Sequence, residues 1–415
     1  MLPAGPAAGP LAQTVALHRD PLRALQAAQA AYGDVFTIRL ATARPLVVVA
    51  DPAEVEGLLH ADPDRAHAGE ARRRILPAAS PRSVFGGDGE AHRTARAHVA
   101  GALAPDVLDP RRPAMAEIAA RHADGWPHGR PFRLLPRMRA LIDEVFVRCV
   151  LGVRDEARAR ALPGAIGRML WTPGNPPMSL PGRGLLGAAA TPFYRRRMAP
   201  VAQLLAAELD ARRTADPGGD DILGRMTALP TPDAVDELLS TVMAAQEPPA
   251  AGLTWLLERL ARAPELADRF VADEGARDAI ARETLRVRAP AFAALRRLTA
   301  PREVGGHALP AGVSVVLPTP LLHRHPRAFP EPEAFRPERW TGEPPPETTY
   351  LPFGGGARRC IGEPLAHAYL GALVPAVLRR VRLRAVLPEP ERMVLRGTIL
   401  VPHRSALVRA RRFGA

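Results

Sequence analysis

The chain has 415 residues, of which 47% are hydrophobic, and its 56 basic and 43 acidic residues give a formal net charge of +13. This length and hydrophobic content allow a large buried core, whereas only two cysteines, Cys149 and Cys360, exclude a disulfide scaffold and a cysteine zinc site. No run of about 18 apolar residues predicts a transmembrane helix, and residues 1–14 lack the basic start of a signal peptide. We therefore expect a cytoplasmic protein without a membrane span.

All 56 basic residues are arginines, because the sequence contains no lysine. This bias is typical of GC-rich coding, but a basic face would also attract an acidic protein partner. Nucleic acid is not an expected partner, because the arginine clusters at 72–74 and 195–197 are short and no recognition module accompanies them.

The N-terminal part combines helical and strand patterns. Asp51-Pro52 is a typical helix start, because aspartate accepts hydrogen bonds from the first turn and proline fits its first position. Residues 70–89 show no periodicity, so we expect an irregular, arginine-rich segment there. The expected elements are a helix at 20–32, strands at 35–40 and 45–50, and helices at 51–60 and 91–103.

Helical patterns dominate residues 91–288, with proline and glycine interruptions at 163–192. Thr231-Pro232 predicts the start of a long helix, with Thr231 as its cap, that ends near Ala263. The remaining segments are short strands at 295–298 and 314–317, a proline-rich coil at 326–346, and strands at 382–386, 393–395 and 405–409. We therefore predict a mainly α fold with small β-sheets (α+β), built as one domain over 1–415, with a β-containing part at 35–50.

One window, 353–362, reads Phe-Gly-Gly-Gly-Ala-Arg-Arg-Cys-Ile-Gly and leads to an apolar helix expected from Pro364 to about Val381. Free N–H groups and the macrodipole at a helix start stabilise anions, so we expect a depressed pKa and a thiolate at Cys360. The glycines let the backbone approach a flat, bulky group, and Arg358 is placed to bind a carboxylate on it. These residues indicate an axial cysteine ligand to haem iron. The alternative is a buried free cysteine beside a glycine turn.

The window fits the pattern Phe-Gly-x-Gly-x-Arg-x-Cys-x-Gly, and it resembles the cysteine-ligand signature of the cytochrome P450 family. The resemblance implies a helix-rich, triangular fold that holds haem b, iron protoporphyrin IX, with Cys360 as the proximal iron ligand. Phe353, Gly354 and Gly362 then belong to the loop at the cofactor. The resemblance also implies an oxidoreductase, a haem-thiolate monooxygenase of the soluble bacterial type that uses O2 and external electrons.

Two sets of residues have counterparts in this family. Glu283 and Arg286 are an i, i+3 pair on one helix face, and with Arg339 from the segment 337–340 the resemblance implies a structural triad. Without the resemblance, the pair is an ordinary surface ion pair.

The second set concerns the haem propionates, to which the resemblance assigns His92, Arg96, Arg296 and Arg358. Bidentate arginine suits two carboxylates. His92 is alternatively a satisfied structural histidine, and the neighbouring Arg297 leaves the assignment of Arg296 open by one residue.

The long helix at 231–263 departs from the family pattern. Family members usually carry Ala-Gly-x-Glu/Asp-Thr-Thr over the distal face of the haem, whereas residues 244–249 here read Ala-Ala-Gln-Glu-Pro-Pro. The acid remains as Glu247, but Pro248 replaces the threonine that positions water for proton delivery, and proline has neither hydroxyl nor N–H. Two helical prolines also predict a kink. Gln246, Glu247 and Pro248 are therefore the candidate catalytic positions.

Three activities remain open for this helix. The enzyme is a monooxygenase with protons from substrate or water, it performs phenol coupling or peroxide-driven oxidation, or it is weak or coupled to a specialised partner. Glu247 is either a solvent-linked proton donor or a helix carboxylate that faces water. A haem-binding accessory protein without turnover is the non-enzymatic alternative.

Electrons are expected from outside the chain, because no phosphate loop and no Gly-x-Gly-x-x-Gly turn is present. The resemblance implies a ferredoxin and a ferredoxin reductase as donors. It places 72–85, 170–186, 244–249, 290–294 and 398–399 around the substrate, and their few ionisable groups favour an apolar or aromatic small molecule. By analogy we expect a hydroxylation in bacterial secondary-metabolite or antibiotic biosynthesis by a monomer, with the substrate free or tethered to an acidic carrier protein.

Overall fold

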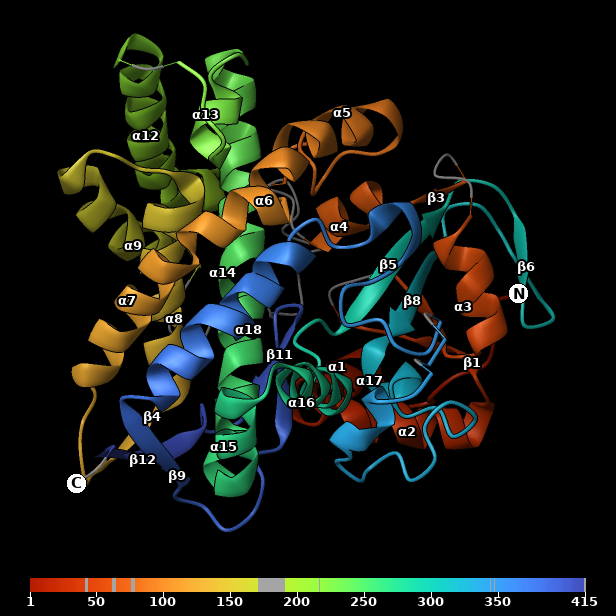
Figure 1. The fold of residues 1–415 in the computed structure, drawn as a ribbon. Helices are drawn as coiled ribbons and strands as arrows, with labels where there is room; N and C mark the ends of the chain where they lie inside the picture. The colour runs from red at the N-terminus through yellow and green to blue at the C-terminus, as the bar shows by residue number, and fades with distance from the viewer. Residues whose placement is uncertain are drawn as a thin grey trace.

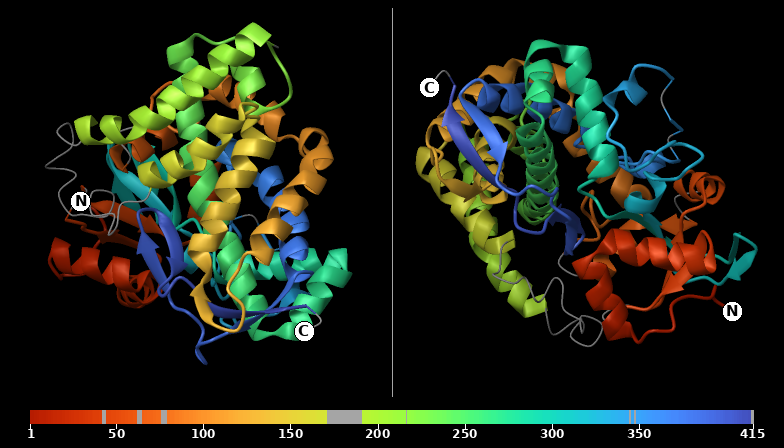
Figure 2. Two further views of the ribbon diagram at one scale, coloured as in Figure 1. Left: turned by 90° about the vertical axis from the view of Figure 1, so that its left-hand side faces the viewer. Right: turned by 90° about the horizontal axis from the view of Figure 1, so that it is seen from below.

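The computed structural model describes residues 1–415 except 42–43, 62–64, 76–78, 171–190, 216, 344, 347 and 414–415. Helix α14 (Thr231–Arg262) runs through its centre, with helices on one side and the N-terminal sheet on the other (Figure 1; seen from below in Figure 2). The other helices are α1 (Pro10–Arg19), α2 (Pro21–Tyr32), α3 (Pro52–Leu59), α4 (Ala68–Ile75), α5 (Gly89–Ala100), α6 (Pro105–Leu108), α7 (Arg112–Asp124), α8 (Leu134–Val145), α9 (Glu156–Leu170), α12 (Thr191–Ala215), α13 (Ile222–Met226), α15 (Pro264–Ala272), α16 (Glu274–Val287), α17 (Thr319–Leu322) and α18 (Glu363–Leu378). Single turns of other helix types lie at Gly101–Leu103, Asp109–Arg111, Phe146–Leu151, Pro337–Trp340 and Gly356–Arg358.

Two predicted helix starts have different outcomes. The Asp51 side chain accepts a hydrogen bond from the Ala53 N–H at 3.0 Å and caps α3, as expected. The prediction of Thr231 as a cap is wrong, because Pro230 occupies the cap position of α14. The Thr231 hydroxyl instead accepts a hydrogen bond from Arg213 Nη1 at 2.7 Å, so a distant partner takes the group that would have capped the helix.

The expectation that residues 70–89 are irregular throughout is also wrong, because α4 occupies the beginning of this segment. The carboxylate of Asp88 accepts hydrogen bonds from the N–H groups of Gly69 and Glu70, both at 2.7 Å. Asp88 thus satisfies the first turn of α4 as a capping residue would. A cap supplied from so far along the chain leaves no local pattern in the sequence.

The largest sheet joins the N-terminal part of the chain to the segment after Pro290. Its order is β1-β2-β8-β5-β3, in which β2 and β8 are parallel and the other neighbours antiparallel. Val47 lies opposite Val315, and both are fully buried, as β-branched residues are favoured on a covered pleated surface. The strands are β1 (Val35–Ile38), β2 (Leu46–Val49), β3 (Ala66–His67), β5 (Ala293–Leu298) and β8 (Ser314–Pro318).

The smaller sheets contain most of the strands that sequence periodicity missed, because strands of three or four residues give almost no pattern. One has the order β4-β12-β9, with β4 (Pro131–Arg133), β12 (Leu407–Arg412) and β9 (Val381–Ala385). A second pairs β10 (Met393–Arg396) with β11 (Ile399–Pro402). A third pairs β6 (Arg302–Val304) with β7 (His307–Leu309). Because β9 starts at Val381, α18 ends sooner than expected. The predicted class, mainly α with small β-sheets, is confirmed.

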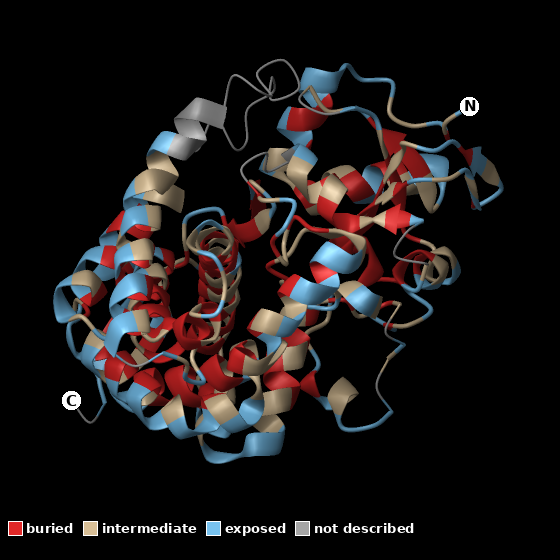
Figure 3. Cartoon of the chain, turned by 90° about the horizontal axis from the view of Figure 1, so that it is seen from above, coloured by how far each residue is buried: buried red, intermediate tan, exposed pale blue. Residues whose placement is uncertain are grey.

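The core is built around α14, and buried residues fill the interior while exposed residues follow the periphery (Figure 3). Trp255 of α14 is fully buried and donates from Nε1 to the carbonyl of Leu400 at 3.0 Å, which ties the helix to β11. The helix continues through Pro248 and Pro249. Since proline has no N–H, the carbonyls one turn earlier, at Ala244 and Ala245, lack their intrahelical donors.

His323, which follows α17, links three parts of the fold from a fully buried position. Its Nδ1 lies 3.1 Å from the Arg286 carbonyl at the end of α16, and its Nε2 accepts from the Leu351 N–H at 2.8 Å. Nδ1 therefore carries the proton and Nε2 must stay unprotonated to accept. Burial lowers the pKa of His323 to about 3.

This histidine makes stability depend on pH with a definite sign. An unfolded histidine titrates near pH 6.5, so the unfolded chain binds more protons between about pH 6.5 and about pH 3, and the stability due to His323 is lost as the pH falls through this window. Between about pH 6.5 and about pH 5 the loss is about 2 kcal/mol. Urea unfolding of the wild type and His323→Gln at these pH values measures it, and equal pH dependence in both proteins would contradict the assignment.

Candidate functional site

A cavity of about 1240 Å³ lies at the centre of the molecule. Its wall includes Cys360 and the residues around it, the middle of α14 with Pro248, and the start of β5. Segments far apart in the sequence therefore meet around one space, which is large enough for a cofactor and a small molecule together. Each predicted substrate segment also contributes described residues to this wall, while 76–78 and 171–186 lie outside the described residues.

The loop that carries Cys360 depends on two glycines. Gly354 has φ +69° and Gly356 has φ +61°, a region that favours glycine. A Cβ on Gly356 would also lie 2.2 Å from the Leu59 carbonyl oxygen, so no side chain fits there. The loop is closed by a hydrogen bond of 2.8 Å from the Cys360 N–H to the Phe353 carbonyl.

Cys360 is exposed and its thiol opens onto the cavity, although the protein that surrounds the cavity still desolvates it. This desolvation raises the pKa of Cys360, and a hydrogen bond from the Gly362 backbone opposes it. The expected depressed pKa is therefore wrong for the polypeptide alone. The reason is that desolvation outweighs the hydrogen bond from Gly362, and the carboxylate of Glu363 in the first turn of α18 raises the pKa further.

A cluster of arginines and one histidine lies beside the cysteine. His92, Arg96, Arg296 and Arg358 all line the cavity, as does Arg72, which the sequence analysis did not assign to the cofactor site. Burial lowers the pKa of Arg296 and of Arg358 to about 10, so both remain charged at neutral pH. Burial and then Arg358 lower the pKa of His92 to about 4, so this ring is neutral.

Arg358 is only partly satisfied by the protein. Its Nη2 donates to the Gly87 carbonyl at 2.7 Å and to Asp88 Oδ1 at 2.6 Å. Its Nη1 is buried and has no hydrogen-bond partner among the described residues. Arg96 Nη1 donates to the Arg359 carbonyl at 2.9 Å. A buried donor without a partner is costly, so Arg358 fits a site in which a further acceptor, such as a carboxylate, completes its hydrogen bonds.

The candidate catalytic residues of α14 separate into two groups. Glu247 and Pro248 line the cavity, whereas Gln246 is buried outside its wall, and neither amide atom has a partner among the described residues. Glu247 does not simply face water, because its Oε2 pairs with Arg139 Nη2 of α8 at 2.7 Å. The site thus has an acid at the cavity, but no hydroxyl at the next position.

A further acid near this pair was missed by the sequence analysis. Asp143 of α8 is buried, and burial, followed by the negative charge of Glu247, raises its pKa to about 7. It lies one helical turn after Arg139, on the same face of α8. The only sequence signal is an acidic pair, Asp143 and Glu144, inside the otherwise apolar stretch 141–147, which is unusual in a helix that packs against the core.

The expectation that few ionisable groups surround the cavity is wrong. Among the described residues of its wall, Glu247 is the only carboxylate, while arginines come from many elements. These arginines are Arg44, Arg72, Arg74, Arg96, Arg133, Arg139, Arg197, Arg296, Arg358, Arg359 and Arg396. The sequence analysis missed this because short segments around a predicted pocket do not include the side chains that reach it from β4, α8 and β10.

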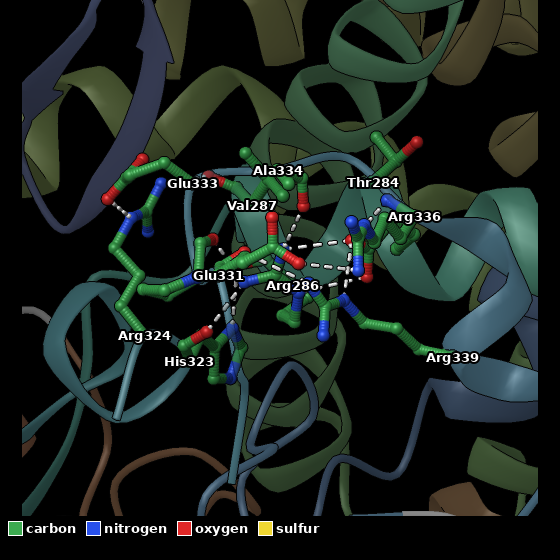
Figure 4. Close-up of polar contacts among 12 residues, drawn as sticks. Thr284, Arg286, Val287, His323, Arg324, Glu331, Glu333, Ala334, Arg336 and Arg339 are labelled. Carbon is green, nitrogen blue, oxygen red and sulfur yellow. Dashed lines mark hydrogen bonds and ion pairs between the residues drawn. The ribbon is translucent and has the colours of Figure 1, made fainter. Parts of the chain in front are cut away.

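Glu283 is the centre of the structural group predicted with Arg286 and Arg339. It is fully buried and accepts two hydrogen bonds from Arg286, at 2.8 and 2.9 Å. It also accepts from the Arg336 N–H at 2.8 Å, from Trp340 Nε1 at 3.0 Å and, at 3.4 Å, from Arg339. Figure 4 shows Arg286 and Arg339 converging on this group from α16 and from the coil after Glu331. The structure thus brings the three predicted residues together.

Removing the charge of Glu283 should be strongly destabilising, because it leaves Arg286 buried without its counter-charge. We expect Glu283→Gln to lower the free energy of unfolding by about 3–5 kcal/mol. The matched control is Glu338→Gln, since Glu338 is exposed and lies 3.7 Å from Arg269, and exposed ion pairs contribute less than about 1 kcal/mol. Urea unfolding of both variants measures the difference, and similar losses would contradict the role of burial.

The comparisons with known proteins agree with each other. A family model described as cytochrome P450 matches residues 277–408. The protein described as cytochrome P450 135B1 of Mycobacterium tuberculosis is 35% identical over 432 aligned positions, covering 99% of this chain and 91% of its own length. Cytochrome P450 135A1 of the same organism is 29% identical and covers 100% and 96% of the two chains.

Solved structures share the fold over nearly the whole chain. CYP175A1 from Thermus thermophilus superposes with a TM-score of 0.76 at 29% identity, covering 97% of both chains. The retinoic acid-bound cyanobacterial CYP120A1 superposes with a TM-score of 0.84 at 20% identity, covering 99% of both chains.

These findings establish the class as a haem-thiolate monooxygenase, an oxidoreductase whose cofactor is iron protoporphyrin IX. This chain belongs to the cytochrome P450 family. The family generally takes its electrons from redox partners such as a ferredoxin and its reductase. Among the described residues, none of the helices has the length and apolar character needed to span a bilayer.

Proposed function

We propose that this cytochrome P450 hydroxylates an apolar or aromatic small molecule in bacterial secondary metabolism, such as antibiotic biosynthesis, with Cys360 as the axial ligand of the haem iron. The observation that carries the proposal is that the thiol of Cys360 and the Pro248 segment of α14 line one large cavity. Much of the remaining cavity wall is apolar, including Leu253, Phe292 and Leu395. The protein acts cytoplasmically as a single-domain monomer.

The residues around the cysteine fit the cofactor. Arg358, with its unpartnered Nη1, Arg96 and Arg296 would bind the two propionates, and neutral His92 would donate a hydrogen bond. Phe353, Gly354 and Gly362 would shape the loop on the thiolate side. When bound, the haem supplies the oxidising chemistry, and thiolate ligation favours cleavage of the O–O bond.

Protons must reach the substrate side without a hydroxyl at position 248. Glu247 is the acid on the cavity wall, Arg139 fixes its carboxylate, and Asp143 lies behind the pair with a pKa near neutrality. A water or a substrate hydroxyl would complete the path between Glu247 and the reacting position. The carbonyls of Ala244 and Ala245, which lack intrahelical donors, are acceptors that can hold such a group.

The cysteine assignment is tested by changing the ligand atom. In Cys360→His the haem iron can still be bound, but without thiolate, so the absorbance of the reduced carbon monoxide complex should lose its thiolate signature and oxygenase turnover should fall below detection. Cys149→Ser is the matched control, because Cys149 is buried in the core and burial raises its pKa to about 11. A thiolate signature that survives in Cys360→His would overturn the assignment.

Pro248 favours one second candidate, a peroxide-driven oxidase. Peroxide already carries the two electrons and the protons, so a site that uses it does not depend on a hydroxyl on α14. The first candidate, the monooxygenase, takes its electrons from a ferredoxin and its reductase. Its substrate is either free or tethered to an acidic carrier protein, which the +13 charge would attract. Turnover with ferredoxin and reductase, compared with peroxide alone, separates the two.

Restoring the hydroxyl should improve proton delivery. We expect Pro248→Thr to raise the product formed per electron pair about ten-fold when reductase and ferredoxin supply electrons. This is less than the roughly 100-fold or more typical of a positioned proton donor, because the product formed per electron pair cannot exceed one. Pro249→Thr is the matched control, because Pro249 also lines the cavity but a hydroxyl there is turned by about 100° around α14 from one at position 248. Product and reductant consumption are measured together, and an unchanged ratio in Pro248→Thr would show that proline does not limit proton supply.

A further inference from the structure

The outer face of one small sheet is strongly basic. In the sheet β4-β12-β9, Phe132, Val408 and Leu383 are buried, whereas the residues that alternate with them are exposed or half-buried. Most of these alternating residues are arginines, namely Arg133 of β4, Arg409 and Arg411 of β12, and Arg382 and Arg384 of β9. The three strands contain no acidic residue, although the whole chain has 43 acidic and 56 basic residues. A preference for arginine over lysine does not explain why acidic residues are missing here.

The strand register places these arginines directly opposite one another. Arg409 pairs with Arg384, and Arg411 pairs with Arg382, across β12 and β9. Side chains at such positions have Cβ atoms only about 5 Å apart, and like charges there are destabilising. A negatively charged partner at this face would offset the repulsion.

The protein itself supplies little compensation for these charges. Arg382 pairs with Asp268 of α15. Arg384, Arg409 and Arg411 have no acidic partner in the part of the chain that the structure describes. All three are exposed, and their strands lie together at the edge of the molecule near the C-terminus (Figure 1). The face is therefore open to an acidic partner.

One edge of this basic face reaches the cavity. Arg133 pairs with Leu407, two residues before Arg409 and therefore on the same face of the sheet, and it also lines the cavity. Helix α8 begins at the next residue, and its Arg139 pairs with Glu247 at 2.7 Å. Six helical residues span about 9 Å, so this edge lies close to the candidate catalytic segment of α14.

The opposite edge of the face is remote from the cysteine loop. Helix α18 starts at Glu363, three residues after Cys360, and its 16 residues make it about 24 Å long. Strand β9, which carries Arg384, follows the far end of this helix. An electron donor has to dock close to the metal centre. This face therefore suits a different acidic partner, one that presents a substrate to the cavity beside Arg133.

We infer that the basic face of β4-β12-β9 docks an acidic carrier protein, whose tethered substrate enters the cavity beside Arg133. This inference rests on the proposed function and commits it to the tethered form of the substrate. Complementary charge orients the carrier and speeds its association, whereas the apolar part of the cavity binds the substrate itself. Nucleic acid is also anionic, but it brings no substrate to the cavity.

The test separates docking of the carrier from binding of the substrate. A fluorescently labelled acyl carrier protein, with a dodecanoyl group on its phosphopantetheine arm, is titrated with the haem-loaded protein, and anisotropy gives the Kd. Arg384→Gln/Arg409→Gln should weaken docking about ten-fold at low salt, the loss expected for two exposed charge contacts. High salt should weaken docking to wild type and narrow this difference.

Substrate binding is measured in parallel with the free N-acetylcysteamine thioester of dodecanoic acid, from the spin-state change in absorbance. Its Kd should be the same in wild type and in the double variant, because the thioester has no acidic surface. The matched control is Arg23→Gln/Arg65→Gln, which removes the same charge from exposed arginines of α2 and next to β3, on the other side of the molecule (Figure 1). This control should dock the carrier as wild type does.

No docking to wild type at low salt, or docking that survives Arg384→Gln/Arg409→Gln, would overturn the inference. The proposed function would then still stand if the thioester changes the spin state, and absence of that change counts against the proposed function separately. A labelled ferredoxin or DNA duplex that binds more tightly than the carrier, and loses its binding in the same double variant, would assign the face to that partner and overturn the inference as well.

Discussion

The buried ion pair between Glu283 and Arg286 is the interaction on which the rest of the structure depends. Both side chains are fully buried, a position that is tolerable only when every donor and acceptor is satisfied. Arg286 meets this condition by donating to the carbonyls of His323, Pro332 and Ala334. Since His323 in turn accepts from the Leu351 N–H, the pair fixes the backbone immediately before the cysteine loop. The position of the thiol is thus determined by a charge pair that never touches the cavity.

Charge is distributed unevenly around the cavity. Arginines line it on the cysteine side and again at β4, α8 and β10, while its acid, Glu247, is already paired. The first group suits the propionates of a resident cofactor. Between them, α14 contributes an apolar surface with two helical prolines. The arginines on the cavity wall can therefore orient a charged ligand by electrostatic attraction.

The sequence predicted best those features that lie within a few residues of each other. The window 353–362 and the mainly helical class were recognisable, because glycine spacing and helical periodicity are local. The pair Glu283 and Arg286 was recognisable only through the family resemblance, because by itself it has the pattern of a surface ion pair. Three features were not predictable, because each depends on residues distant in the sequence. They are the capping of α4 by Asp88, the hydrogen bond from Arg213 that keeps Thr231 from capping α14, and the arginine-lined cavity wall. The pKa of Cys360 was predicted in the wrong direction for a related reason, since burial is a property of the whole fold.

Asp88 has a consequence that reaches beyond the capping of one helix. The same carboxylate accepts hydrogen bonds from the first turn of α4 and from Arg358 of the cysteine loop. Binding of a group next to Cys360 and the stability of α4 are therefore thermodynamically linked. An acceptor that draws Arg358 away from Asp88 changes the hydrogen bonds that Asp88 accepts from the first turn of α4. Linkage of this kind is reciprocal. A ligand that straightens or loosens α4, whose Arg72 and Arg74 border the cavity, must in turn alter how tightly the cofactor is retained.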